Sequence, residues 1–109
     1  MCIRDRVNVP LPAGTDSLLF KKSYEDIIFP KLEKFSPDII FVSAGFDAHI
    51  SDPLADFRLI KDDFYWITKV LNDFATKHCK GKLISCLEGV YNIKALSESC
   101  LEHVKGLIL

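Results

Sequence analysis

Two short apolar runs constrain the fold of this chain more than any other feature. Residues 39–44 (Ile-Ile-Phe-Val-Ser-Ala) and 82–87 (Lys-Leu-Ile-Ser-Cys-Leu) each have the length and composition of a strand, and the first is typical of a strand covered on both faces. A segment with helical spacing of apolar residues lies between them, which is the pattern of a crossover connection. The two runs are therefore predicted to be parallel strands joined by a right-handed crossover.

Three segments of the chain have helical periodicity. The first is expected to begin at a cap supplied by Asp16 or Ser17, and Pro30 is expected to kink or break it. The second lies between the two strands and closes near Gly81, and the third begins after Asn92, a favourable N-cap. The apolar stripes of these three helices are Phe20, Tyr24, Ile27, Ile28 and Phe35; Phe64, Ile67, Leu71, Phe74 and Ala75; and Ile93, Leu96, Cys100, Val104 and Leu107.

The order of these elements predicts an α/β fold in which a parallel sheet is flanked by helices. The length of 109 residues allows one core. Two parallel strands alone make a poor sheet, because both of their edges stay open and their apolar faces need neighbours. We therefore expect the sequence to be part of a larger domain.

The charge balance and hydropathy pattern exclude several classes of protein. Lys and Arg number 14 and Asp and Glu number 15, a formal net charge of −1, so no basic excess is present to neutralise a phosphate backbone. No run approaches the roughly 18 consecutive apolar residues that indicate a membrane span. The first six residues carry charge where a signal peptide would be apolar. We expect a cytoplasmic protein without direct nucleic-acid or membrane contact.

The cysteines argue against a metal-bound or cross-linked scaffold. The four cysteines form no Cys-x-x-Cys pair, which excludes a zinc ribbon held by thiolates. Cys79, Cys86 and Cys100 lie in apolar segments with regular patterns, so we expect reduced, buried thiols.

Two polar residues follow the two predicted strands closely. In open α/β sheets, ligands bind beyond the carboxyl ends of the strands, so Asp47 and Tyr91 are expected to point into one cleft. A carboxylate can bind a metal or act as a base, and a tyrosine hydroxyl can donate to an oxygen that becomes negative. A turn-capping role for Asp47 and a packing role for Tyr91 stay open at this point. His49 is expected to be a loop residue or a support for a ligand, not a ligand itself.

Several ordered motifs resemble the carboxyl-terminal part of the histone deacetylase family. They are residues 43–49 (Ser-Ala-Gly-Phe-Asp-Ala-His), 52–54 (Asp-Pro-Leu) and 87–92 (Leu-Glu-Gly-Val-Tyr-Asn), and residues 8–14 resemble the segment that precedes the first of them. The similarity is to the class II and bacterial branch, which includes acetylpolyamine amidohydrolases, and it covers residues 8–109.

The resemblance implies an arginase/deacetylase-type fold and a zinc-dependent amidohydrolase that removes acetyl groups from lysine side chains or similar amines. Asp47 matches one of the aspartate ligands of the zinc ion. Tyr91 matches the tyrosine that hydrogen-bonds the substrate carbonyl and the tetrahedral oxyanion. Leu54 matches a residue at the mouth of the substrate tunnel, and Gly89 lies in the loop that forms one tunnel wall. Val90 stands where many relatives have glycine, so the tunnel shape is expected to differ.

The resemblance also implies that much of the catalytic machinery lies elsewhere. In the family, the paired catalytic histidines and the Asp-x-His segment with the other two zinc ligands come earlier in the domain. None of the three histidines here forms such a pair. Residues 8–109 are thus expected to be the carboxyl-terminal portion of a deacetylase catalytic domain, inactive without its missing amino-terminal part. Residues 1–7 are expected to be a non-native junction, because residues 1–6 resemble a translated sequencing adaptor.

Other functions are compatible with the same pattern. The resemblance implies an acetylated lysine or polyamine as substrate, and the uncharged Leu54 favours acetyl-lysine or another acylated amine. The alternative to a deacetylase is a non-catalytic α/β module that acts through a partner, or half of a split enzyme, docking through exposed strand edges. A flavodoxin-like nucleotide binder is disfavoured, because the strand-to-helix turns carry no glycine-rich phosphate loop.

Overall fold

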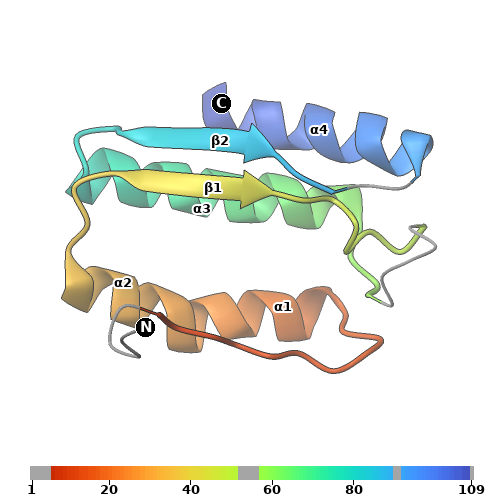
Figure 1. The fold of residues 1–109 in the computed structure, drawn as a ribbon, viewed down its shortest axis with the longest axis horizontal. Helices are drawn as coiled ribbons and strands as arrows, with labels where there is room; N and C mark the ends of the chain where they lie inside the picture. The colour runs from red at the N-terminus through yellow and green to blue at the C-terminus, as the bar shows by residue number, and fades with distance from the viewer. Residues whose placement is uncertain (1–5, 52–56, 90–91, 109) are drawn as a thin grey trace.

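The computed structural model describes residues 6–51, 57–89 and 92–108. Its elements follow the predicted order, with helices before, between and after two strands (Figure 1). In chain order they are α1 (Ser17–Ser23), the π-helical turn η2 (Tyr24–Ile28), α2 (Phe29–Phe35), β1 (Ile40–Ala44), α3 (Lys61–His78), β2 (Leu83–Leu87) and α4 (Ile93–Ile108).

The two strands are parallel, as the sequence predicts, and pair from Ile40 with Leu83 to Ala44 with Leu87. Helices α3 and α4 lie together behind the sheet, and no described helix lies over its front face (Figure 1). Phe41 and Ile84 are partners in the register and face away from α3 and α4, with exposed fractions of 68% and 46%. The expectation of a strand covered on both faces is therefore met on one face only within the described residues.

The core lies between the sheet and the helices behind it. Ala44, Phe46, Leu59 and Phe64 form its buried centre. The rings of Phe46 and Phe64 meet edge to face with their centroids 5.2 Å apart, an arrangement that aromatic quadrupoles favour. This cluster ties the end of β1 to the first turns of α3.

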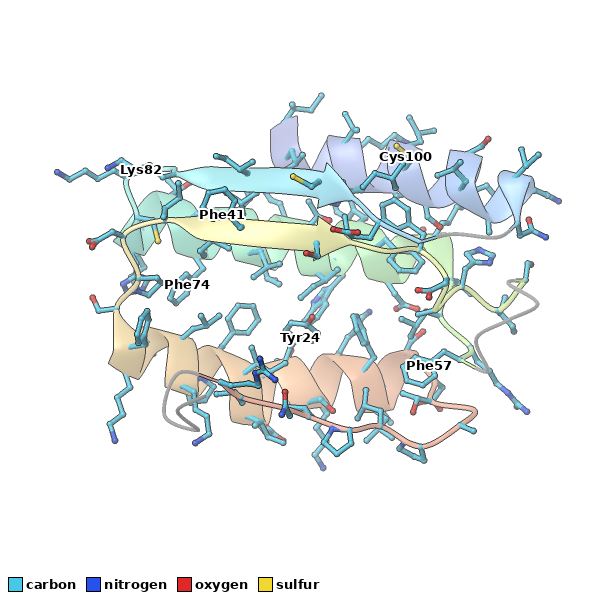
Figure 2. All side chains as sticks on the ribbon, in the orientation of Figure 1. Tyr24, Phe41, Phe57, Phe74, Lys82 and Cys100 are labelled. Carbon is cyan, nitrogen blue, oxygen red and sulfur yellow. The ribbon has the colours of Figure 1, made fainter. Side chains whose placement is uncertain are left out.

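An aromatic cluster joins the first helical segment to α3. Figure 2 shows Tyr24 in the space between α1 and α3, where its ring lies 5.1 Å from Phe20 and 6.4 Å from Trp66. Burial raises the pKa of the Tyr24 hydroxyl. Further along the same contact, the rings of Phe29 and Phe74 are 6.1 Å apart.

A buried carboxylate also holds α1 against the start of α3. Asp63 is 1% exposed and accepts hydrogen bonds from the Ile60 backbone N–H at 2.9 Å and from the Ser17 hydroxyl at 2.5 Å. Lys21 Nζ lies 3.7 Å away from the same carboxylate. Several donors thus compensate the burial of this charge.

The predicted helix caps are confirmed, whereas the effect of Pro30 differs from expectation. Asp16 accepts from the Leu19 backbone N–H at 3.1 Å, and Asn92 accepts from the Ala95 N–H at 2.9 Å. Pro30 lies at the start of α2, directly after the π-helical turn, and Ile28 just before α2 keeps helical backbone angles. The chain therefore stays helical, and a π-helical turn precedes the proline where a break was expected.

The cysteine prediction is confirmed for one thiol and wrong for another. Cys79 is buried, and its Sγ donates to the Pro37 carbonyl oxygen at 3.1 Å. Cys86 is exposed, because it pairs with Ser43 on the face of the sheet that α3 and α4 do not cover. Cys100 is half-buried. In the described ranges, no helix has the length and apolar content needed to cross a bilayer.

Candidate functional site

The carboxyl ends of the two strands lie side by side, as parallel pairing requires. The Phe46 N–H donates to the Gly89 carbonyl oxygen at 3.2 Å, and the Glu88 N–H donates to the Ala44 carbonyl oxygen at 2.9 Å. A Cβ placed on Gly45 would lie 3.3 Å from the Gly89 oxygen, which is closer than most side chains tolerate. Glycine at position 45 thus lets the loop that carries Asp47 approach the loop that carries Gly89.

Asp47 is a described residue at this edge with the chemistry of a metal ligand. Its side chain is half-buried, and its Oδ1 lies 3.4 Å from the Cβ position built on Gly45, so it turns back toward the strand end. It has no hydrogen bond or ion pair with any described residue. Both carboxylate oxygens are free of such partners, which fits a role as one oxygen ligand of a zinc ion.

Asp47 alone does not complete a metal centre. Over residues 6–51, 57–89 and 92–108, no group of three or more His, Cys, Asp or Glu side chains is placed to hold a metal ion. A hydrolytic zinc site needs three protein ligands and an open position. The described residues by themselves therefore do not form such a site.

The remaining predicted site residues divide into two groups. Gly89 is half-buried and accepts the hydrogen bond that joins the two loops. Leu54, Val90 and Tyr91 lie outside the described residues. The structure therefore brings together the loops of Asp47 and Gly89, and the predicted convergence of Asp47 with Tyr91 stays a prediction.

His49 was expected to be a supporting residue, and its surroundings are more specific than the sequence indicates. It is 5% exposed, and its ring is nearly parallel to that of Phe64, with centroids 6.4 Å apart. Its Nδ1 accepts from the Ser51 backbone N–H at 3.0 Å, and its Nε2 lies 3.7 Å from Glu98 Oε2. Glu98 is a residue that sequence reasoning missed, because helical periodicity marks it only as one polar position of α4.

A second histidine, His103 of α4, bonds to residues of α3 and β2. Thr68 Oγ1 donates to the Phe64 carbonyl oxygen at 2.6 Å and also lies 2.6 Å from His103 Nδ1. A hydroxyl has one proton, so Thr68 accepts from Nδ1–H, and Nε2 is left to accept from the Ser85 hydroxyl at 2.8 Å. Burial lowers the pKa of His103. The ring joins α3, β2 and α4 through these hydrogen bonds.

A comparison with models of protein families shows which family has this fold and these loops. A model of the histone deacetylase domain matches residues 3–107. The chain belongs to the histone deacetylase family. The resemblance inferred from the three motifs is thus confirmed over nearly the whole sequence.

Curated relatives of this deacetylase-family chain come from plants and bacteria. Histone deacetylase 14, chloroplastic, from Arabidopsis thaliana is 38% identical over 102 residues, which are 94% of this chain and 24% of the relative. The histone deacetylase-like amidohydrolase of Pseudomonas aeruginosa is 38% identical over 86 residues, which are 79% of this chain and 23% of the relative. The chain therefore spans about a quarter of the length of these two relatives.

Solved structures confirm the predicted α/β fold. The HD domain of HDA15 superposes with a TM-score of 0.85 at 33% identity, covering 94% of this chain and 29% of that one. Acetylpolyamine aminohydrolase from Burkholderia pseudomallei superposes with a TM-score of 0.78 at 27% identity, covering 93% of this chain and 28% of that one. The parallel strands and flanking helices of this deacetylase-family chain are thus part of an arginase/deacetylase-type fold.

Proposed function

We propose that this chain is the carboxyl-terminal part of a zinc-dependent deacetylase that hydrolyses acetyl-lysine or a similar acetylated amine. The observation that carries the proposal is Asp47: a half-buried carboxylate, unpaired among the described residues, at the carboxyl end of β1 in a chain of the deacetylase family. The ends of parallel strands are where α/β folds place their ligands. Asp47 is therefore assigned as one metal ligand of the complete enzyme.

Each predicted site residue has a defined task in this proposal. A bound zinc ion supplies Lewis-acid polarisation of the acetyl carbonyl and activation of water. Asp47 contributes one oxygen ligand to the ion. Tyr91 donates a hydrogen bond to the carbonyl oxygen as negative charge develops there. Leu54 lies at the tunnel mouth, and Gly89 and Val90 form a tunnel wall beside the acyl chain.

The other ligands and the acid/base histidines belong to the rest of the catalytic domain. Three observations support this division: the lack of a metal cluster among the described residues, the span of about a quarter of the relatives, and the exposed apolar face around Phe41 and Ile84. We propose that the amino-terminal part of the same domain covers this face. The 109-residue chain alone is then inactive.

The first experiment compares the isolated chain with the complete enzyme. We expect the pure 109-residue chain to retain no stoichiometric zinc by elemental analysis and to release no acetate from acetyl-lysine peptides. Clear turnover by the pure chain would contradict the proposal. In the complete enzyme, acetyl-lysine peptides are expected to be better substrates than acetylated polyamines, and the opposite preference would reassign the substrate.

Two substitutions in the complete enzyme test the assigned roles. We expect Asp47→Asn to abolish zinc retention and activity, because a neutral amide is a weak zinc ligand. Tyr91→Phe is expected to lower kcat about 100-fold or more with zinc retained, because loss of one oxyanion donor has this effect. Asp73→Asn is the matched control, since this carboxylate on α3 is 62% exposed and pairs with Lys69. Full activity in Asp47→Asn would overturn the assignment.

The alternative is a module that completes a split enzyme through a separate chain. The open edges of the two-stranded sheet are the feature that favours it, because a partner strand can pair there. A chain that is monomeric, unfolds cooperatively and binds little hydrophobic dye would support a self-sufficient module. Aggregation and strong dye binding would support a part of a single larger domain.

A further inference from the structure

We propose that Glu98 is a positioning residue that fixes the Asp47 loop through His49. The inference rests on the proposed function, because Asp47 must be a metal ligand for its position to matter. Glu98 lies on α4, and His49 lies two residues beyond Asp47 on the loop that follows β1. The contact therefore joins the segments that follow the two strands.

The arrangement of hydrogen bonds fixes the orientation of His49. The Ser51 backbone N–H donates to Nδ1 at 3.0 Å, so the lone pair of Nδ1 is used as an acceptor. A neutral imidazole carries its proton on the other nitrogen, which here is Nε2. Nε2–H faces the Glu98 carboxylate at 3.7 Å, slightly beyond hydrogen-bond length and well within electrostatic attraction. The contact does not require the ring to be charged.

Asp47 lies between two anchors on the same short loop. On one side, the Phe46 N–H donates to the Gly89 carbonyl oxygen at 3.2 Å. On the other side, His49 is held by Glu98, and the His49 N–H returns to the Phe46 carbonyl oxygen at 3.2 Å. Anchors before and after a residue restrict the backbone angles that it can adopt. Backbone bonds of Leu59 with Ala48 and Ile50 restrain the same stretch, and the contact of His49 with Glu98 adds a side-chain restraint.

Glu98 is suited to this task because α4 is itself held firmly. Its neighbour Ser99 is fully buried, as is Ala95 one turn earlier. Further along α4, His103 is bonded to Thr68 of α3 and Ser85 of β2. A side chain on such a helix transmits a fixed position to the loop, which a residue on a second loop would not do.

The decisive experiment compares three variants of the complete enzyme. Glu98→Leu removes the carboxylate, Glu98→Gln keeps an acceptor oxygen, and Glu102→Leu is the matched control. Glu102 lies one turn further along α4 and bonds to Lys105 at 3.1 Å. We expect Glu98→Leu to weaken zinc binding 10- to 100-fold, the usual effect of losing a residue that supports a ligand. Glu98→Gln and Glu102→Leu are expected to stay within about threefold of wild type, measured by chelator competition.

A metal-free readout separates positioning from general stability. Hydrogen exchange of the Ser51 amide, measured on the metal-free complete enzyme, is expected to accelerate in Glu98→Leu and not in Glu102→Leu. A merely structural role of Glu98 would lower the melting temperature and leave zinc affinity unchanged. Wild-type zinc affinity in Glu98→Leu would therefore overturn the inference.

The same measurements distinguish failure of the inference from failure of the proposed function. If Asp47→Asn loses zinc while Glu98→Leu keeps wild-type affinity, only the positioning role is wrong. If Asp47→Asn itself binds zinc normally, Asp47 is not a ligand, and both the proposed function and the inference are overturned.

Discussion

The two faces of the β1–β2 sheet differ in how fully this chain covers them. Toward α3 and α4, Val42 and Ser85 are half-buried and Ala44 is buried. On the opposite face, Phe41 and Ile84 expose 68% and 46% of their surface. Among the described residues, the same two strands thus have one face that is packed against helices and one face that is an exposed apolar surface. The difference shows which face of the sheet the described residues cover and which face they leave exposed.

The helices on the packed face, α3 and α4, are in close contact where they cross. Gly106 on α4 lies so close to α3 that an added Cβ would be 2.7 Å from Thr68 Cβ and 3.1 Å from the Lys69 backbone nitrogen. The hydrogen bonds of His103 lie at the same crossing. Packing and directional bonds therefore act together on this side, whereas the open face has neither among the described residues.

The largest expected effect is the loss of the helix crossing in Gly106→Ala. The added methyl group cannot fit against Thr68 without separating α3 from α4, and such overpacking costs about 3 kcal/mol of unfolding free energy. Urea denaturation of the chain measures the change. Ser97→Ala, an exposed position on the same helix, is the control and is expected to change stability by less than about 0.5 kcal/mol. Equal stability of both variants would contradict the close crossing.

The next prediction compares substitutions of two serines on opposite faces of the sheet. Ser85→Ala leaves His103 Nε2 without its donor in a buried site, which costs about 1 to 2 kcal/mol. Ser43→Ala changes the open face, where the side chain is exposed, and is expected to cost less than about 0.5 kcal/mol. Unfolding free energies of the two variants give the comparison directly. A larger loss in Ser43→Ala would reverse the assignment of the faces.

Much of the fold could be predicted because its signals are local. The strands begin at Ile40 and Leu83, each one residue inside the predicted run, and Asp16 and Asn92 cap their helices as expected. The π-helical turn before Pro30 could not be predicted. Its first residue, Tyr24, packs against Trp66 of α3, which is a contact between distant parts of the sequence.

The place of the candidate site could be predicted from the sequence, but the partners of the nearby histidines could not. Parallel strands bring their carboxyl ends together, so the approach of the Asp47 and Gly89 loops followed from topology. The partners of His49 and His103 did not follow, because Glu98 and Ser85 occupy positions that periodicity marks only as polar or alternating. Only the position of α4 in the fold brings Glu98 to the His49 ring and the His103 ring to Ser85.

A pH titration tests the contribution of His103, on the packed face, without a substitution. Burial lowers the pKa of His103 below its ordinary value of 6.5, so the unfolded chain binds the proton more tightly than the folded chain does. The contribution of the neutral ring is present above about pH 6.5 and is lost as pH falls through the folded pKa. We expect the unfolding free energy to fall with acidification through this range. In His103→Gln this part of the decrease is absent, and an identical decrease in that variant would assign it to other groups.

The smallest expected effect on stability comes from the open face. The double substitution Phe41→Thr with Ile84→Thr places β-branched, strand-favouring side chains at both positions and removes two exposed apolar groups. Because these groups contact little among the described residues, the unfolding free energy is expected to change by less than about 0.5 kcal/mol.

Val42→Thr, on the half-buried side that packs on the core, is the control and should cost about 1 to 2 kcal/mol by placing a hydroxyl there. The double variant should also bind less hydrophobic dye and self-associate less, since an exposed apolar patch drives both. A destabilisation as large as that of Val42→Thr, with dye binding unchanged, would show that the face around Phe41 is already covered within this chain.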